Sequence, residues 1–208
     1  MTFWEFVGLS VLINLAVTIV LWLVSIVKRN VTVIDPFWGL GFVVMVGALA
    51  LVSPGATLRT ALVVTLMTIW GLRYALHLYW RQWGHTEDST YYPYKEWREQ
   101  AGKHFWWVSF GKVILPQGMG ITVMGLPVLM AMYAPTPTYI TTLDILGTLL
   151  WAVGVVFEGI ADYQLACFKH DPLNHGQVLN TGLWRYSRHP NYFGCLLYTS
   201  PSPRDEKV

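Results

Sequence analysis

The residues best suited to chemistry lie in one short run, GLWRYSRHPNYFG, at residues 182–194. Its cationic, hydrogen-bonding and aromatic side chains are Trp184, Arg185, Tyr186, Arg188, His189, Asn191 and Tyr192. Guanidinium groups bind phosphate or carboxylate oxygens through two parallel hydrogen bonds, and they also stack on aromatic faces. This density of groups between two apolar segments predicts a site for an anionic, ring-bearing ligand.

A second set of polar residues lies upstream, inside an apolar segment that ends at Phe168. Glu158 and Asp162 are four residues apart and therefore share one helix face, with Lys169 two turns further along. At about 1.5 Å per residue, Asp162 lies roughly 9 Å and Glu158 roughly 15 Å from Phe168. An unpaired acid at such a depth costs about 2.5–3.5 kcal/mol, so each needs a partner or a wet cavity. The basic residues of the 182–194 run are candidate partners, and a purely structural ion-pair network is the alternative.

The elements that must position these residues are membrane helices. Hydrophobic residues make up 54% of the 208 residues and charged residues only 12%, about half the usual charged share of soluble domains. Five apolar segments reach the roughly 20 residues needed to cross a bilayer: Phe3–Val27, Val33–Val52, Leu58–Trp80, Phe105–Ala134 and Leu143–Phe168. The sequence therefore predicts an all-α, multi-pass transmembrane helical bundle, with the start of a sixth helix near Tyr192. Pro116 and Gly118 predict a kink or break in the fourth segment.

The charges of the connecting segments are asymmetric. One side, formed by the loops after the first, third and fifth segments, carries Lys28, Arg29, Arg81, Lys95, Arg98, Lys103, Lys169, Arg185 and Arg188. The opposite loops carry only Arg59. The positive-inside rule then predicts an integral protein of a bacterial inner membrane with its N-terminus outside. Loops 81–104 and 169–191 are expected in the cytoplasm. A net charge of +2 without a basic run argues against nucleic acid as a partner.

Two runs carry a family resemblance. EGIADYQLACFK, from Glu158 to Lys169, followed by GLWRYSRHPNYFG, resembles the cofactor site of bacterial steroid 5α-reductase-like membrane proteins, which are related to sterol reductases and isoprenylcysteine carboxyl methyltransferases. The resemblance implies that the helix acids contact the adenine and ribose end of NADPH, while the second run holds the phosphates and the nicotinamide side. It assigns to cofactor binding Glu158, Asp162, Lys169, Arg185, Tyr186, Arg188, His189, Asn191 and Tyr192. No GxGxxG loop is present, which excludes a Rossmann-type site.

The resemblance implies a membrane-embedded NAD(P)H-dependent reductase, an oxidoreductase acting on a double bond of a sterol-like or isoprenoid lipid. The lipid substrate would enter from the bilayer. One alternative is an S-adenosylmethionine-dependent methyltransferase of the isoprenylcysteine type, and another is a non-enzymatic membrane protein. Irregularly spaced histidines without paired cysteines or an HExxH motif predict no metal site. The sequence gives no indication of the oligomeric state.

The polar segment 81–104 is rich in aromatic residues and in both charges. Its aromatic side chains, which include Tyr94, suit a belt at the level of the lipid headgroups. The alternative is a lid or substrate mouth, in which Glu87 and Tyr91 are the candidate catalytic acid and tyrosine. Further upstream, Asp35 followed by Pro36 predicts the N-cap and first turn of a helix.

The sequence predicts one membrane domain over residues 1–194, whose part from about 143 to 194 binds the cofactor. After Gly194 the similar family continues with Glu and another hydrophobic helix, whereas this chain reads CLLYTSPSPRD from Cys195 to Asp205. That string resembles a translated sequencing adapter. We therefore expect residues 195–208 to be a non-native tail, and the chain to be a truncated and inactive copy of an enzyme.

Overall fold

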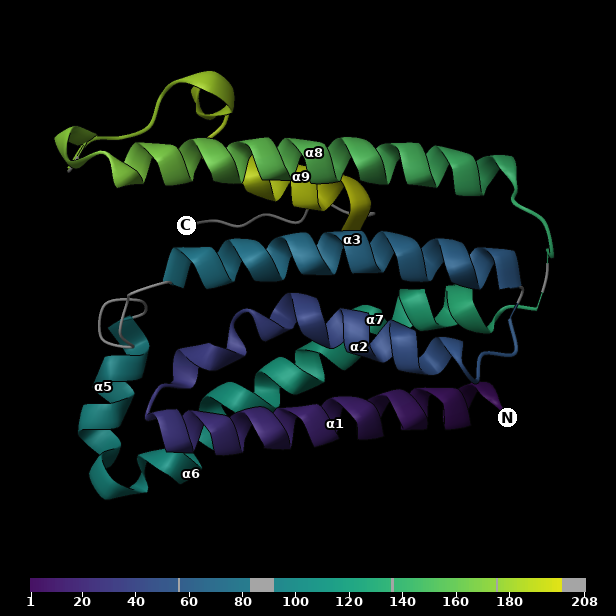
Figure 1. Cartoon of the computed structure of the whole chain (residues 1–208), viewed down its shortest axis with the longest axis horizontal. Helices are drawn as coiled ribbons and strands as arrows, with labels where there is room; N and C mark the ends of the chain where they lie inside the picture. The colour runs from purple at the N-terminus through teal and green to yellow at the C-terminus, as the bar shows by residue number, and fades with distance from the viewer. Residues whose placement is uncertain (56, 83–91, 136, 175, 200–208) are drawn as a thin grey trace. The chain divides into compact units, whose positions relative to one another are not determined.

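The computed structural model describes the chain except for residues 56, 83–91, 136, 175 and 200–208 (Figure 1). All regular elements of the described residues are helical. Five stretches are long and apolar enough to cross a membrane: Phe3–Lys28, Val31–Ala50, Leu58–Arg81, Tyr94–Tyr133 and Thr142–His170. Each overlaps one of the five predicted segments, and together they confirm the all-α, multi-pass transmembrane fold. The fourth stretch begins at Tyr94 rather than at the predicted Phe105, because part of the segment expected to be a loop is helical. The chain divides into two compact units, Met1–Tyr139 and Ile140–Val208.

Four long helices form the body of the first unit: α1 (Phe3–Lys28), α2 (Phe37–Ala50), α3 (Thr57–Gln82) and α7 (Leu115–Tyr133). Helix α1 packs on α7 and α2 packs on α3 (Figure 1). Glycines allow the second pair to approach closely, because a Cβ on Gly39 would collide with the carbonyl oxygen of Gly71. Without a hydrophobic driving force between helices in lipid, such small residues favour association through close backbone packing.

A polar stripe lines the interior face of α1. Ser10, Asn14 and Thr18 recur every four residues and are fully or almost fully buried. The amide Nδ2 of Asn14 donates to Thr122 Oγ1 of α7 at 2.9 Å, and a Cβ on Gly118 of α7 would collide with the Thr18 hydroxyl. Polar groups are costly to expose to hydrocarbon. The stripe therefore fixes which face of α1 turns towards α7.

The fourth predicted segment is a chain of helical pieces. Helix α5 (Tyr92–Ala101) and the 3-10 turn η2 (Gly102–His104) precede α6 (Phe105–Ser109), and a π turn, η3 (Phe110–Ile114), joins α6 to α7. The irregularity predicted around Pro116 is present, but as a widened turn rather than a break. Pro116 occupies the first turn of α7, where its missing N–H leaves no unmade helical hydrogen bond.

Two predictions about the polar parts of this unit are wrong. Tyr94 does not belong to a headgroup belt, because it is buried and accepts a hydrogen bond from Gln117 Nε2 at 3.3 Å. Asp35 does not cap α2, because the N-cap position falls on Pro36 and carries no side-chain hydrogen bond. Asp35 instead ends the 3-10 turn η1 (Val31–Ile34), where its N–H donates to Thr32 O at 3.0 Å. Its Oδ1 accepts from the Tyr94 hydroxyl at 3.5 Å.

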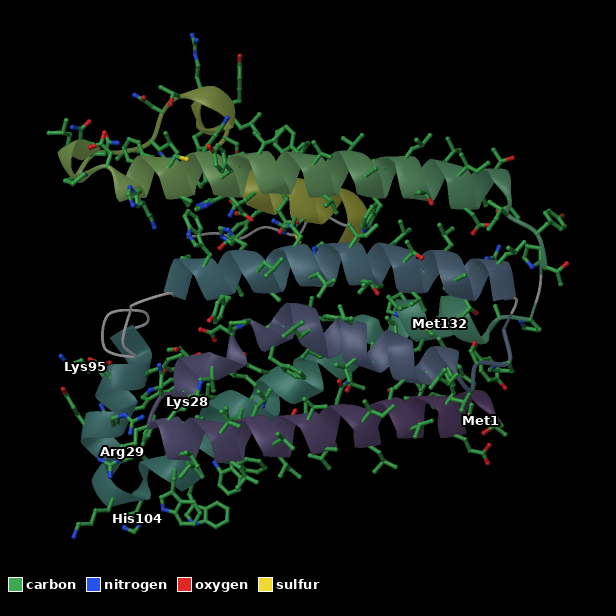
Figure 2. All side chains as sticks on the ribbon, viewed as in Figure 1. Met1, Lys28, Arg29, Lys95, His104 and Met132 are labelled. Atoms are coloured by element: carbon green, nitrogen blue, oxygen red, sulfur yellow. The ribbon has the colours of Figure 1, made fainter. Side chains whose placement is uncertain are left out.

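The first unit has one basic end. Figure 2 shows Lys28, Arg29, Lys95 and His104 gathered where α1 ends, while Met1 and Met132 lie at the opposite end. The charge asymmetry of the sequence is thus also an asymmetry in space within this unit. The direction in which the unit faces across the membrane stays a prediction.

The second unit consists of α8 (Thr142–His170), the 3-10 turns η4 (Pro172–Asn174) and η5 (Gly182–Arg185), and α9 (Pro190–Thr199). Helix α8 starts with a capping box, in which Asp144 N donates to Thr141 Oγ1 and Thr141 N donates to Asp144 Oδ2. Helix α9 begins at Pro190 and lies along α8 (Figure 1). The sixth helix predicted near Tyr192 is therefore confirmed to begin there.

Candidate functional site

The acids of α8 are both buried, with 5% of Glu158 and 8% of Asp162 exposed. Their four-residue spacing on a continuous helix places them on one face, as predicted. Buried carboxylates keep their charge only with hydrogen-bond donors or cations nearby. Hydrogen-bond donors or cations must therefore contact α8 on the face that carries these two acids.

One such partner comes from α9. Asn191 Nδ2 donates to Asp162 Oδ1 at 3.3 Å, which joins the acids predicted on α8 to the GLWRYSRHPNYFG run. The other polar atom of the same amide, Asn191 Oδ1, is buried without a hydrogen-bond partner among the described residues. A buried acceptor of this kind costs about 1–3 kcal/mol when it is left unsatisfied. It is suited to a donor supplied from outside the protein, such as a hydroxyl or an amine.

Glycine allows α9 to lie this close to α8. A Cβ on Gly194 would stand 2.7 Å from Glu158 N and 2.7 Å from Gly154 O, both of them backbone atoms of α8. The neighbouring Phe193 packs edge-on against Phe157, with ring centroids 5.4 Å apart. The last glycine of the motif thus serves helix packing, and the packing holds Asn191 beside Asp162.

The loop between α8 and α9 is anchored back onto α8 by three side-chain hydrogen bonds. Trp184 Nε1 donates to Ala161 O at 3.0 Å, Asn174 Nδ2 donates to Phe168 O at 3.0 Å, and Leu183 N donates to Gln164 Oε1 at 3.0 Å. Gly182 has a φ of +59°. A Cβ at this position would also lie 2.5 Å from the Gln164 amide nitrogen. Only glycine satisfies both conditions.

A cavity of about 810 Å³ opens between the end of α8 and this anchored loop. Three of the predicted cofactor residues line it, namely Lys169, Arg188 and His189. Trp184 adds an aromatic wall, and Asn174, Gln177 and Asn180 add amide groups. The volume falls within the range of about 300–1,000 Å³ that is typical of small-molecule sites. Cations, amides and an aromatic ring together suit a ligand that carries anionic groups and a flat ring.

The other predicted cofactor residues of the 182–194 run do not line this cavity. Tyr192 stacks on His189 with ring centroids 5.1 Å apart, so it braces a cavity residue without lining the cavity. Arg185 and Tyr186 are exposed and are not part of the lining, and Tyr186 is 84% exposed. The structure therefore divides the run into two residues that line the cavity, one that is paired with the α8 acid, one that stacks on His189 and two that do none of these. Arg188 and His189 line the cavity as exposed side chains.

The candidate catalytic residues Glu87 and Tyr91 lie outside the described residues. Two contributors were not predicted from the sequence. Gln164 anchors the loop through Leu183, and Asn174 both anchors the loop and lines the cavity. The spacing of these residues carries no periodic signal, because each pairs with backbone rather than with another side chain of the motif. Within the described part of the chain, no cluster of three or more His, Cys, Asp or Glu side chains is arranged to hold a metal ion.

The chain was compared with known proteins. A family model described as "Protein of unknown function (DUF1295)" matches residues 21–199; this family is associated with steroid 5α-reductase-like membrane proteins. A protein of Ustilaginoidea virens described as "Probable O-methyltransferase ustE" is 35% identical over 54 residues. The matched part spans 26% of this chain and 19% of that relative. No solved structure matches.

Proposed function

The chain belongs to the DUF1295 family of membrane proteins, and from that premise we propose that it is an NAD(P)H-dependent reductase embedded in the membrane. The proposed substrate is a sterol-like or isoprenoid lipid with an activated carbon–carbon double bond. The observation that carries the proposal is the cavity lined by Lys169, Arg188 and His189. The bilayer is the natural source of such a substrate, because the protein is built from membrane-spanning helices.

The charge of the cavity favours a cofactor that contains phosphate. The charged lining residues are Lys169, Arg188 and Asp171. The two cations outnumber the one acid, and they share the hollow with the aromatic Trp184. Phosphate oxygens form short, charge-assisted hydrogen bonds with guanidinium and ammonium groups. S-adenosylmethionine has no phosphate, and its only anionic group is one carboxylate beside two cationic groups. Two basic side chains therefore offer it less than they offer a pyrophosphate. NADPH fits this donor set better.

The acid–amide pair is the second part of the proposed site, and neither Asp162 nor Asn191 lines the cavity itself. Asp162 accepts from Asn191, whose Oδ1 has no partner among the described residues. A ribose hydroxyl or an exocyclic amine can donate to these oxygens. The chemistry that a reduced nicotinamide supplies is a hydride for the double bond. The role of the protein's own residues is to bind and orient the cofactor.

A methyltransferase is the second candidate, and one observation favours it. The curated relative from Ustilaginoidea virens carries the name of an O-methyltransferase. The buried carboxylates Glu158 and Asp162 would also suit a sulfonium cation. The two candidates place the cofactor in the same unit but require ligands of opposite charge. A direct binding comparison therefore separates them.

The test is ligand-dependent thermal stability of the purified protein in detergent. A ligand bound only by the native state raises the melting temperature. We expect NADPH to raise it and S-adenosylmethionine to leave it unchanged. The reverse result would reject the reductase in favour of the methyltransferase, and a response to neither ligand would favour the non-enzymatic reading.

Variants of two arginines of the same motif sharpen the test. The side chains of Arg185 and Arg188 are both exposed, and the family resemblance assigns both to the cofactor, but only Arg188 lines the cavity. Losing one charge-assisted hydrogen bond of about 1.5–3 kcal/mol weakens binding roughly 10- to 150-fold. We expect this loss for Arg188→Ala and for Asn191→Ala, and unchanged affinity for Arg185→Ala. Equal losses for both arginine variants would show that the cavity is not the site.

A further inference from the structure

A second hollow lies at the basic end of the first unit, and it shares no lining residue with the candidate cofactor site. Its volume is about 580 Å³. The end of α1, helix α5, turn η2 and helix α6 form its walls, and its charged lining residues are Arg29, Arg98 and Lys103. The acidic residues of α5, Glu96 and Glu99, are not part of the lining. Three cations from three separate segments thus converge on one hollow.

A main-chain carbonyl and an aromatic ring hold one of these cations, Arg98, in place. Arg98 Nη2 donates to Arg29 O at 3.2 Å, and the Arg98 guanidinium lies 4.0 Å from the centre of the Phe105 ring. Arg29 ends α1 in the left-handed conformation with a φ of 49°, which turns the chain away from the helix axis. Trp22 Nε1 donates to Trp106 O at 2.9 Å and so joins α1 to α6. The walls of the hollow are therefore joined to one another, with Arg98 fixed between them, while Arg29 and Lys103 line the hollow as exposed side chains.

The surroundings of the hollow point to a lipid rather than to a soluble anion. Arg29 directly follows the membrane-spanning α1, so the hollow lies where the span meets the headgroup layer. Trp106 and Trp107 are 41% and 56% exposed beside it, and tryptophan is the side chain enriched at this depth. The apolar part of the lining consists of Ile26, Val31, Phe105 and Trp106, of which Ile26 and Trp106 are exposed. A ligand that joins an anionic group to an acyl chain matches both parts.

We propose that this hollow binds the phosphate headgroup of an anionic phospholipid, with Arg29, Arg98 and Lys103 around the phosphate and an acyl chain along Ile26 and Trp106. Basic pockets between transmembrane helices are suited to such headgroups. The hydroxyls of Ser25 and Ser109, which also line the hollow, donate to Trp22 O and Trp106 O. The cations are therefore the groups that select the anion. The site is independent of the cofactor cavity.

The test compares two charge-matched double variants in detergent supplemented with lipid. Arg29→Gln/Lys103→Gln removes two lining cations, whereas Lys28→Gln/Lys95→Gln removes two cations of the same basic end that lie outside the lining (Figure 2). Arg98 is kept, because it also joins two segments. The readout is the affinity for phosphatidylglycerol relative to phosphatidylcholine, measured by native mass spectrometry and by melting temperature.

We expect the wild-type protein to prefer phosphatidylglycerol. In the Arg29→Gln/Lys103→Gln variant the affinity for phosphatidylglycerol relative to phosphatidylcholine should fall roughly 30-fold, because each basic side chain contributes to binding an anionic lipid and two are removed. The Lys28→Gln/Lys95→Gln variant should keep the wild-type preference. Equal losses in both variants would reduce the effect to general surface charge and overturn the proposal. Inorganic phosphate alone should give no stabilisation, and stabilisation that disappears in the lining variant would identify a soluble anion as the ligand instead.

A second measurement on the wild-type protein covers the case in which the lining variant does not fold. Photoactivatable phosphatidylglycerol should crosslink to peptides within residues 94–110, which contain α6 and most of the basic lining. Crosslinks spread evenly over the lipid-facing sides of α1 and α3 would contradict a defined site.

Discussion

Replacing Gly182 by alanine perturbs the candidate site at one identifiable contact. The residue has a φ of +59°, a left-handed conformation that costs a non-glycine residue about 1–2 kcal/mol. The new Cβ would also lie 2.5–2.7 Å from the amide group of Gln164. Gln164 can move aside, because its amide is the end of a flexible side chain. Moving it breaks the hydrogen bond from Leu183 N to Gln164 Oε1, at a further cost of about 1 kcal/mol.

Together the two costs lower the free energy of local loop opening by about 2–3 kcal/mol, because the anchoring hydrogen bond joins the loop to α8. Amide hydrogen exchange of the Leu183 peptide measures this opening directly. We expect exchange to accelerate roughly 30- to 150-fold in Gly182→Ala. Affinity for the cofactor should fall in parallel, because Trp184 and Arg188 belong to the same loop.

Two further variants isolate the cause. Gly176 has a φ of +79°, but a Cβ there would meet nothing within 4 Å, so Gly176→Ala adds strain without disturbing Gln164. It should leave protection at Leu183 unchanged. Gln164→Ala removes the same hydrogen bond as Gly182→Ala, so the two changes should be less than additive. Strict additivity, or a loss of Leu183 protection in Gly176→Ala, would refute the contact as the cause.

Two other substitutions test the helix packing of each unit. Gly194→Ala should destabilise the second unit by about 1–3 kcal/mol in denaturant unfolding, because its Cβ would meet only α8 backbone; Gly147→Ala, which meets nothing within 4 Å, is the control and should not destabilise it. Asn14→Val should destabilise the first unit by about 0.6–1.7 kcal/mol through loss of the bond to Thr122. A stability unchanged from wild type would show that the hydrogen bond between Asn14 and Thr122 makes no net contribution to the free energy of unfolding.

The parts of the structure that follow periodic rules could be predicted. The length of the apolar segments predicts the five spanning helices, and the four-residue spacing of Glu158 and Asp162 predicts that they share a helix face. Proline gives the start of α9, because Pro190 fits the first turn of a helix. In each case the signal lies within one element and requires no knowledge of its neighbours.

The remaining parts depend on contacts between elements. The bond from Leu183 to Gln164 joins residues 19 apart and uses a backbone donor, so no side-chain pattern reveals it. Tyr94 has the sequence context of an interfacial aromatic residue, but it turns inward because Gln117 and Asp35 offer its hydroxyl two hydrogen-bond partners. Arg185 and Arg188 look equivalent in the motif. Only the fold of the loop makes Arg188, and not Arg185, part of the cavity lining.

The polar stripe of α1 has a consequence for biogenesis. The partner of Asn14, Thr122, lies 108 residues further along the chain. At ordinary synthesis rates of about 5–20 residues per second, α1 leaves the ribosome roughly 5–20 s before that partner exists. During this interval α1 is apolar enough to insert, but its amide has only provisional partners in the membrane. Insertion and assembly of this helix are therefore separate events, and the second waits for α7.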